Sequence, residues 1–311
     1  MRSIQKCLVA LSIIAGVAAP LGAGVSGAST TSSFPLTLKM ADGTFTFTTR
    51  PDAIVSLSPT STEMLYAIGA GSQVKAVDNY SDYPTNAPKT TLSGYDPNVE
   101  AIAKYNPDLV IVASDTANFN TQMAALKIPV LYDPAASNLS QACAEYGPLG
   151  KVTGHNAQAD KEVATIKATI AHIVATTPHA KKNTTYYYEL EPDYYSVTSA
   201  TFVGKLFSLL GLTSIADSAK GLASSGGYPQ LNASFILKAN PTYIFLADTL
   251  CCNATAASVT ARPGWSTLSA VKNHRIVPLN DDIASRWGPR ITILLQDVAD
   301  GLKGTPVPAS S

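Results

Sequence analysis

The chain holds few side-chain arrangements that could carry out catalysis. Its four histidines, His155, His172, His179 and His274, do not form a set at metal-ligand spacing, and each is better explained as a solvated or capping residue. No GxGxxG turn, phosphate-binding loop, GxSxG elbow or CxxC pair is present. Without a fixed nucleophile, base or metal, the sequence predicts a binding protein that uses no cofactor and no metal, rather than an enzyme.

Three cysteines lie beyond residue 28, and they could form one disulfide. Cys251 and Cys252 are adjacent in the run TLCCNAT, which suits a vicinal disulfide, while pairing of either with Cys143 is the alternative. The sequence leaves both pairings open. In each case at least one thiol stays unpaired.

Residues 1–28 have the features of a secretory signal peptide. Arg2 and Lys6 give a positive start, the apolar run 7–19 is too short for a comfortable membrane span, and residues 26–28 form a small-residue cleavage site. We therefore predict an exported protein, in the periplasm or on the outer face of the cytoplasmic membrane. An uncleaved membrane anchor is the alternative interpretation.

Length and charge narrow the class of protein further. The 311 residues are enough for two domains, and Lys plus Arg equals Asp plus Glu at 22 each. This balance gives no sign of a nucleic-acid partner or an anionic membrane partner. We expect a monomer whose ligand is a small molecule.

A long amphipathic helix is predicted over residues 154–178. Val163, Ile166, Ile170 and Ile173 recur at steps of three and four, which places them on one face of a helix. At 1.5 Å per residue such a helix is about 35 Å long, roughly the diameter of a small domain. We interpret it as a rigid connection between two lobes, with a surface helix of one large domain as the alternative.

Strand-like and helix-like segments alternate on both sides of this helix. The runs 109–113 and 243–247 are apolar throughout, as parallel strands covered on both faces require. In the first lobe, Thr60 or Ser61 followed by Glu63 predicts a helix start. The pattern predicts two doubly wound α/β lobes with a ligand cleft between them, at the carboxyl ends of the strands. The predicted divisions are a signal peptide at 1–28, a tail and β-hairpin at 29–52, a first lobe at 53–153, the linker helix at 154–178, a second lobe at 179–303 and a tail at 304–311.

Five sequence runs, spread over residues 53–303, resemble a known family. They are IVSLSPTSTEMLYAIGAG, VKAVDNYSDYP, PNVEAIAKYNPDLVIVA, GYPQLNASFILKANPTYIFLAD and PGWSTLSAVKNHRIVPLNDDIASRWGPRI. In this order they resemble the extracytoplasmic solute-binding proteins of ABC importers for cobalamin and ferric siderophores, and YSDYP at 80–84 favours the cobalamin-binding branch. The resemblance implies two α/β lobes joined by one long helix.

The resemblance also implies a ligand clamped between aromatic side chains of the two lobes. Tyr80 matches a wall position of the first lobe, Tyr95 lies near a second, and Tyr228 stands where cobalamin binders often carry tryptophan. Asp282 and Arg286, in the loop after the last strand, are expected to reach the cleft and hydrogen-bond the ligand. Core packing is the competing interpretation for each tyrosine, and a structural ion pair is the competing interpretation for Asp282 and Arg286.

Members of the family dock to a permease dimer through one acidic residue on each lobe. Glu100 matches the first-lobe position, whereas Ser234 occupies the second-lobe position. Glu189, Glu191 or Asp193 are candidate substitutes for the missing acid, and Glu189 is also expected among the ligand-binding residues.

The function expected from the resemblance is capture of a corrinoid and its delivery to an ABC importer. A ferric siderophore or haem is the alternative ligand. From other classes, a secreted cleft enzyme and a surface-interaction module that lost transport remain alternatives, and Ser234 in place of an acid is the feature that favours the latter.

Overall fold

The computed structural model describes residues 33–41, 43–116 and 118–307. The predicted signal peptide at 1–28 therefore lies outside the described residues. Within the described ranges, no helix combines the length and the hydropathy that a membrane span needs.

The N-terminal lobe is a four-stranded parallel sheet preceded by a hairpin. The hairpin pairs β1 (Leu36–Met40) with β2 (Gly43–Phe47) in antiparallel register, as the sequence predicts. The sheet has the strand order β4-β3-β5-β6, and its strand interiors are buried. Its elements are β3 (Ile54–Leu57), α1 (Pro59–Ala67), η1 (Gly71–Gln73), β4 (Val74–Val77), α2 (Val99–Ala103), β5 (Leu109–Val112), α3 (Phe119–Ala125), β6 (Val130–Tyr132) and α4 (Leu139–Thr153).

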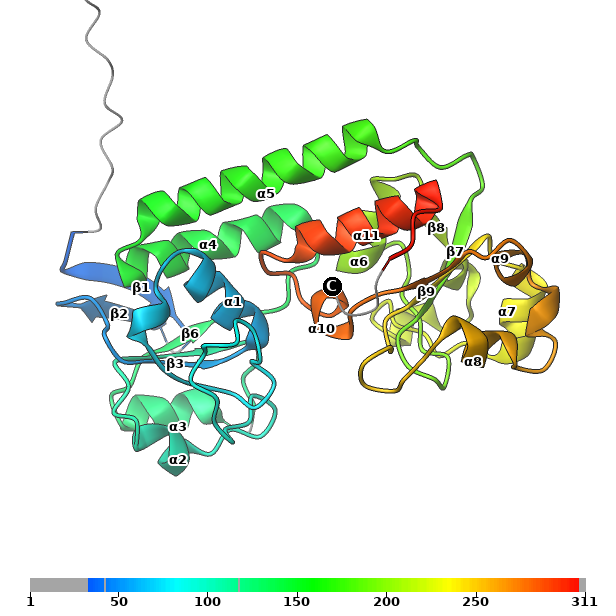
Figure 1. Cartoon of the computed structure of the whole chain (residues 1–311). Coiled ribbons are helices and arrows are strands. Elements are labelled where there is room, and N and C mark those ends of the chain that lie inside the picture. The colour runs from blue at the N-terminus through cyan, green and yellow to red at the C-terminus, as the bar shows by residue number, and fades with distance from the viewer. Residues whose placement is uncertain (1–32, 42, 117, 308–311) are drawn as a thin grey trace, which may run out of the picture.

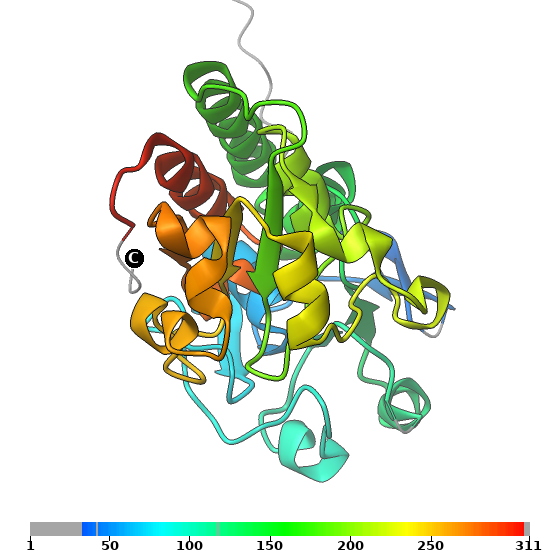
Figure 2. The same ribbon diagram turned by 90° about the vertical axis from the view of Figure 1, so that its right-hand side faces the viewer.

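The C-terminal lobe repeats this plan with the parallel strand order β10-β9-β7-β8. Figure 2 looks onto this lobe and shows helices on both sides of its sheet. Its elements are β7 (Thr185–Glu189), α6 (Phe202–Ser208), β8 (Thr213–Ser214), η2 (Ile215–Ser218), η3 (Leu222–Ser224), α7 (Ala233–Ala239), β9 (Tyr243–Leu246), α8 (Ala256–Thr260), η4 (Trp265–Thr267), α9 (Ser269–Lys272), β10 (Ile276–Pro278), α10 (Asp281–Ala284) and α11 (Ile291–Lys303).

Helix α5 (Asn156–Thr176) joins the two lobes and runs along one side of both (Figure 1). Its predicted apolar face is buried at Ile166, Ile170 and Ile173, against α4 and α11. A β-carbon at Gly150 would come within 2.7 Å of the β-carbon of Ala159, so this glycine lets α4 and α5 pack closely. The predicted fold class, two α/β lobes joined by a single long helix, is confirmed.

The helices of the structure differ at two places from what simple sequence patterns indicate. Helix α1 begins earlier than predicted, because the Ser58 hydroxyl accepts the Ser61 N–H at 3.3 Å and Pro59 suits the first helical position. Residues 265–271 do not form one continuous helix, since Asn240 Oδ1 accepts the Ser269 N–H and a new helix starts there.

The tyrosines of β7 are more deeply buried than simple alternation predicts. Tyr186, Tyr187 and Tyr188 are all fully buried, whereas alternation over the run 186–195 predicts that about half of the tyrosines point inward. The reason is that β7 lies between β9 and β8, with both faces of the sheet covered. Tyr186 and Tyr187 therefore belong to the core, whereas Tyr188, although equally buried, also lies at the wall of a hollow between the lobes.

Candidate functional site

Two adjoining hollows lie between the lobes. The larger, about 320 Å³, is lined by Tyr80, Gly94 and Tyr95 of the N-terminal lobe and by residues of the segment after β10. The smaller, about 170 Å³, lies against the C-terminal lobe and includes Tyr228. Both hollows share the run Ser285, Arg286 and Trp287. A ligand that filled both would therefore contact both lobes.

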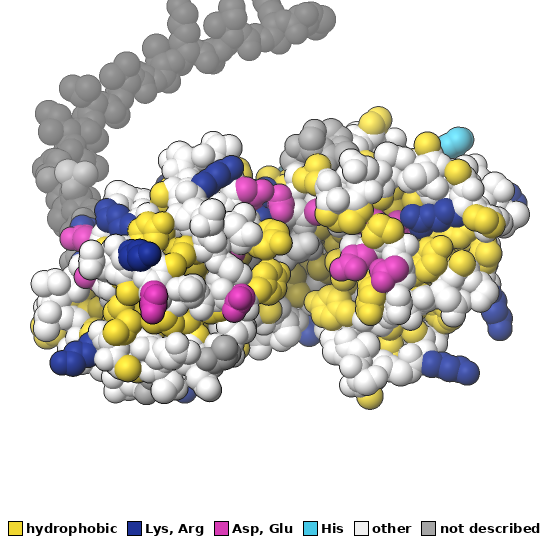
Figure 3. All heavy atoms as spheres, turned by 90° about the horizontal axis from the view of Figure 1, so that it is seen from below, with side chains coloured by type: hydrophobic (Ala, Val, Ile, Leu, Met, Phe, Trp, Pro, Cys, Tyr) yellow, Lys and Arg dark blue, Asp and Glu magenta, His cyan; other side chains and the backbone are white. Residues whose placement is uncertain are grey.

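The predicted aromatic residues lie at the edges of these hollows. Tyr80 is 56% exposed, Tyr95 is 79% exposed and Tyr228 is 42% exposed, so none of them is a core residue. The rings of Tyr80 and Tyr95 meet edge to face with their centroids 5.9 Å apart. The molecule seen from below has a waist between two bulkier halves, with hydrophobic side chains on both sides of it (Figure 3). Exposed rings of this kind offer apolar area to a ligand.

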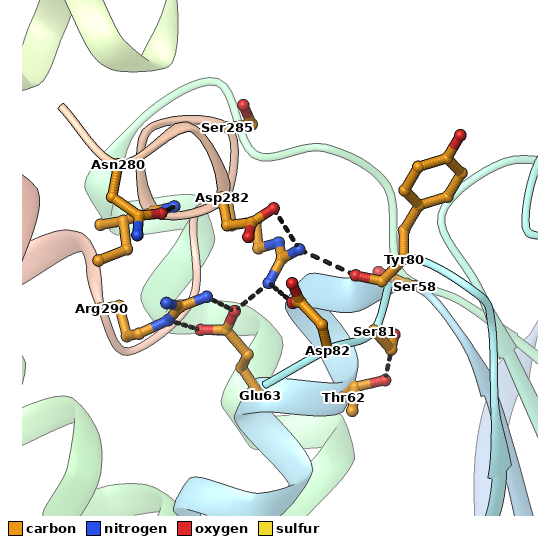
Figure 4. Close-up of polar contacts among 12 residues, drawn as sticks. Ser58, Thr62, Glu63, Tyr80, Ser81, Asp82, Asn280, Asp282, Ser285 and Arg290 are labelled. Atoms are coloured by element: carbon orange, nitrogen blue, oxygen red, sulfur yellow. Dashed lines mark hydrogen bonds and ion pairs between the residues drawn. The ribbon is translucent and has the colours of Figure 1, made fainter. Parts of the chain in front are cut away.

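Five charged residues form an interlobe ion cluster beside the larger hollow. Glu63 of α1 and Asp82 come from the N-terminal lobe, whereas Asp282, Arg286 and Arg290 follow β10 (Figure 4). Arg286 Nη1 donates to Glu63 Oε1 at 2.9 Å and to Asp82 Oδ1 at 3.0 Å. Its Nη2 donates to the Tyr80 carbonyl and to Asp282 Oδ1, both at 2.9 Å.

Arg286 therefore reaches the cleft, but its terminal nitrogens are already occupied. The residue is only 8% exposed, although it lines both hollows. Arg286 lines the hollows and also forms an ion pair with Asp282, so its position fits both interpretations that the sequence left open. The Tyr80 ring points away from the cluster (Figure 4), so its backbone serves the cluster while its ring stays available to a ligand.

The acids of the cluster have shifted pKa values. Burial is the largest single effect on the pKa of Asp82 and raises it, but the charge and hydrogen bond of Arg286, together with hydrogen bonds to Asp282 and the backbone, outweigh burial, so the net pKa lies below its usual range. Burial raises the pKa of Asp282, and the neighbouring Asp82 adds to this effect while Arg286 opposes it. With three carboxylates facing two guanidinium groups, the cluster carries no surplus positive charge for an anionic ligand.

Trp287 makes a second contact between the lobes. Its indole N–H donates to Glu145 Oε2 on α4 at 2.6 Å. Burial, and then repulsion from Asp133, raise the pKa of Glu145 to about 8. This bond fixes the indole at the boundary of the two hollows, where it lines both of them.

A model of the family described as periplasmic binding protein matches residues 54–283. The chain belongs to the periplasmic binding protein family. This binding protein is 29% identical over 282 residues to an uncharacterized ABC transporter substrate-binding lipoprotein of Bacillus subtilis, covering 88% of this chain and 87% of the relative. It is 28% identical over 288 residues to a cobalamin-binding protein of Halobacterium salinarum, covering 88% of this chain and 76% of that relative.

Solved structures agree with this assignment. The periplasmic binding protein fold superposes on a possible iron-binding, periplasmic solute-binding protein of Staphylococcus epidermidis with a TM-score of 0.69 at 26% identity, covering 82% of this chain and 99% of the other. These relatives are substrate-binding proteins, and the chain is a binding protein rather than an enzyme. Among the described residues, no group of three or more His, Cys, Asp or Glu side chains is placed to hold a metal ion.

Glu189 lines neither hollow of this periplasmic binding protein, so the structure does not support its predicted ligand contact. Its side chain is fully buried at the end of β7. Its two carboxylate oxygens accept from Arg262 at 2.5 and 2.6 Å, so they are unavailable to a ligand or a permease. Of the three substitutes proposed for the missing docking acid, only Glu191 and Asp193 are exposed.

The docking and cysteine predictions fall outside the two hollows. Glu100 is exposed in the first turn of α2, and Ser234 is exposed near the start of α7, where its hydroxyl donates to Asn232 Oδ1 at 2.6 Å.

Cys251 and Cys252 are exposed and unbonded, with their Sγ atoms 2.6 Å apart, while Cys143 is buried. The vicinal disulfide stays a prediction.

A larger hollow, about 640 Å³, runs along the surface at α7 and is lined by Lys220, Phe235 and Lys238 among others. All of its lining residues come from the C-terminal lobe, and only one of them is aromatic. Since a ligand there would not contact the N-terminal lobe, we place the candidate site in the interlobe hollows instead.

The sequence left three residues of the site unrecognised: Glu63, Arg290 and Trp287. Glu63 is the single charged side chain of α1, and a lone charge on a buried helix is the signal that could have identified it. Trp287 follows Arg286 directly and is one of only two tryptophans in the chain.

Proposed function

We propose that this periplasmic binding protein captures a corrinoid, cobalamin-like ligand between its lobes outside the cytoplasmic membrane and delivers it to an ABC importer. The proposal rests on one observation about the cleft: its aromatic rings are exposed, while its charged side chains are already paired with one another. Tyr80 and Tyr95 stand on one side and Tyr228 on the other, while Arg286 between them has its terminal nitrogens occupied by protein acceptors.

This arrangement favours a large, mostly apolar ligand edged by amides. Aromatic rings supply apolar contact area, and the backbone and hydroxyl groups at the rim can pair with amides. A corrinoid has this chemistry, and one relative is named a cobalamin-binding protein. We propose that Tyr80, Tyr95, Tyr228 and Trp287 contact the ligand.

A ferric siderophore or haem is the second candidate ligand. It is supported by the similarity to a possible iron-binding protein and by the phenol groups of the cleft tyrosines. An anionic ligand of this kind needs a free cation, however, and the guanidinium groups of the interlobe ion cluster already face three carboxylates. The charge of the cleft therefore supports the neutral amide-edged ligand first.

Delivery requires a contact with a permease dimer, which we assign to exposed acids at the ends of the two lobes. Glu100 offers one carboxylate on the N-terminal lobe. On the C-terminal lobe Ser234 carries no charge, and we propose that Glu191 and Asp193, in the turn after β7, supply it instead. The Asp193 carboxylate is held by the Gln230 side chain at 3.2 Å, a few residues before α7.

A ligand panel tests the proposed function. The purified mature protein is titrated calorimetrically with cyanocobalamin, dicyanocobinamide, haemin and a set of ferric siderophores. We expect saturable binding of at least one of the two corrinoids with one site per chain. Binding of haemin or of a siderophore with no binding of either corrinoid would establish the second candidate instead.

A further inference from the structure

Glu63 links the two lobes although it does not line the cleft itself. Its Oε1 accepts from Arg286 Nη1 at 2.9 Å and from Arg290 Nη2 at 2.6 Å, and its Oε2 accepts from Arg290 Nε at 2.9 Å. The side chain is fully buried, and it is absent from the lining of both hollows. Any effect of Glu63 on a ligand must therefore act through the two arginines.

We propose that Glu63 is a positioning residue of the cleft, which holds Arg286 at the rim of the larger hollow and fixes the spacing of the lobes. The part of this proposal that concerns affinity rests on the proposed function, while the part that concerns lobe spacing does not.

The topology gives Glu63 this role. Within the described residues the chain passes from one lobe to the other through α5, which lies along one side of the molecule (Figure 1). Glu63 lies 223 residues before Arg286 and 227 before Arg290, and its hydrogen bonds bridge the lobes beside the cleft, where the covalent connection does not run. Because the covalent connection lies on one side, links at the cleft restrict tilting of the lobes about it, and this cluster adds such a link to the Trp287–Glu145 hydrogen bond.

The exposure of the other acids that Arg286 contacts indicates where its guanidinium group would move without Glu63. Its other carboxylate partners are the side chains of Asp82, 47% exposed, and Asp282, 36% exposed. Glu63 is the buried anchor that draws the guanidinium inward, and a buried charge that loses its partner is strongly disfavoured. With the anchor neutral, we expect Arg286 to move toward the exposed acids and into the larger hollow.

The chain contains a matched control for this chemistry. Glu189 is also fully buried and also receives two hydrogen bonds from one arginine, Arg262. Both partners of that pair belong to the C-terminal lobe, so loss of its charge cannot change the spacing of the lobes. If Glu63 only stabilised the fold, loss of its charge and loss of the Glu189 charge would have the same effects.

The experiment compares Glu63→Gln with Glu189→Gln in the full mature chain. Hydrogen exchange of the protein alone is followed at residues 78–84 and 282–290, the two segments that meet at the cluster. We expect both variants to melt at lower temperature, but only Glu63→Gln to exchange faster at both segments. Unchanged exchange in Glu63→Gln, or the same increase in Glu189→Gln, would overturn the positioning role without any ligand being used.

Affinity for dicyanocobinamide gives the second readout. We expect at least a ~10-fold loss in Glu63→Gln, equivalent to about 1.4 kcal/mol, and less than about a twofold change in Glu189→Gln. Arg286→Lys keeps the charge but cannot donate to all of the same acceptors, so its loss should not add to that of Glu63→Gln in the double variant. Additive losses would overturn action through Arg286.

Two outcomes keep the proposals apart. If wild type binds no corrinoid, the proposed ligand is wrong, and the hydrogen-exchange comparison still decides the spacing role of Glu63. If Glu63→Gln does not fold, Arg286→Lys tests the same link from the other lobe by the same exchange measurement, and unchanged exchange at residues 78–84 would overturn it.

Discussion

The indole N–H of Trp287 donates to Glu145 Oε2 over 2.6 Å and joins the segment after α10 to helix α4 of the opposite lobe. The indole lines both hollows of the cleft, so one side of the candidate site is held in place by a carboxyl group. That carboxyl group is half-buried, and its pKa of about 8 is raised first by burial and then by Asp133.

This raised pKa predicts a stability that depends on pH. The pKa of Glu145 rises from an ordinary 4.5 to about 8, so the folded state binds the proton more tightly than the unfolded state. The contribution is fully present below about pH 4.5 and is lost as the pH rises through about 8. Glu145→Gln cannot titrate, so it does not lose stability as the pH rises. The difference between its free energy of unfolding and that of wild type should therefore increase by about 1–2 kcal/mol from pH 5 to pH 8.5, a value reduced to allow for partial exposure.

Urea unfolding of both proteins across this pH range measures the effect. Glu100→Gln serves as the control, because Glu100 is exposed and is not part of the cleft. Parallel pH profiles for Glu145→Gln and wild type would show that Glu145 does not titrate in this way.

Truncation of the cleft tyrosines should weaken binding while leaving folding nearly intact. Tyr80 and Tyr228 are half-exposed at the two sides of the cleft, so their rings contribute little to the core. Burial of a ring against a ligand is worth roughly 1.5–3 kcal/mol. We therefore expect Tyr80→Ala and Tyr228→Ala to lower the affinity for a corrinoid about 10- to 100-fold.

Thermal melting and calorimetric titration of the same proteins separate a ligand contact from a core role. Tyr105→Ala is the matched control, since Tyr105 is 38% exposed and lines neither hollow. Core residues would instead lose about 3–5 kcal/mol of stability on truncation. Cleft variants that melt far below the control yet bind normally would assign these rings to the core.

The adjacent cysteines are expected to pair with each other after export. Cys251 and Cys252 are exposed in the loop between β9 and α8, whereas Cys143 is buried on helix α4 of the other lobe. Mass spectrometry of a non-reduced digest should therefore recover a peptide that contains both cysteines. Its mass should be lower than that of the reduced peptide by two hydrogens, about 2 Da. A peptide of Cys143 linked to either of the pair would refute the vicinal disulfide.

The sequence predicted the fold well wherever a periodic pattern is long or fully apolar. The apolar face of α5 and the strands β5 and β9 were located from such patterns, because helix and strand periods leave a direct trace in the residue order. The short elements α8, α10 and β8 were not predicted. Each has only two to five residues, which is too short to display a period.

The candidate site was predicted only in part, because its ion pairs depend on distant segments. The tyrosines and Arg286 were identified from motifs within single runs of sequence. Glu63 and Arg290 meet across 227 residues, and nothing local to either indicates that they are partners. The ion pair of Glu189 could not be predicted for the same reason, since its partner Arg262 lies 73 residues away.

A hydrogen-exchange footprint of dicyanocobinamide tests most directly the claim that the ligand binds between the lobes. The protein is measured with and without saturating ligand, and protection is mapped along the chain. We expect protection in both lobes, at residues 78–82 and 94–95 and at residues 282–287. Protection confined to the surface hollow at Lys220, Phe235 and Lys238, or confined to one lobe, would contradict it.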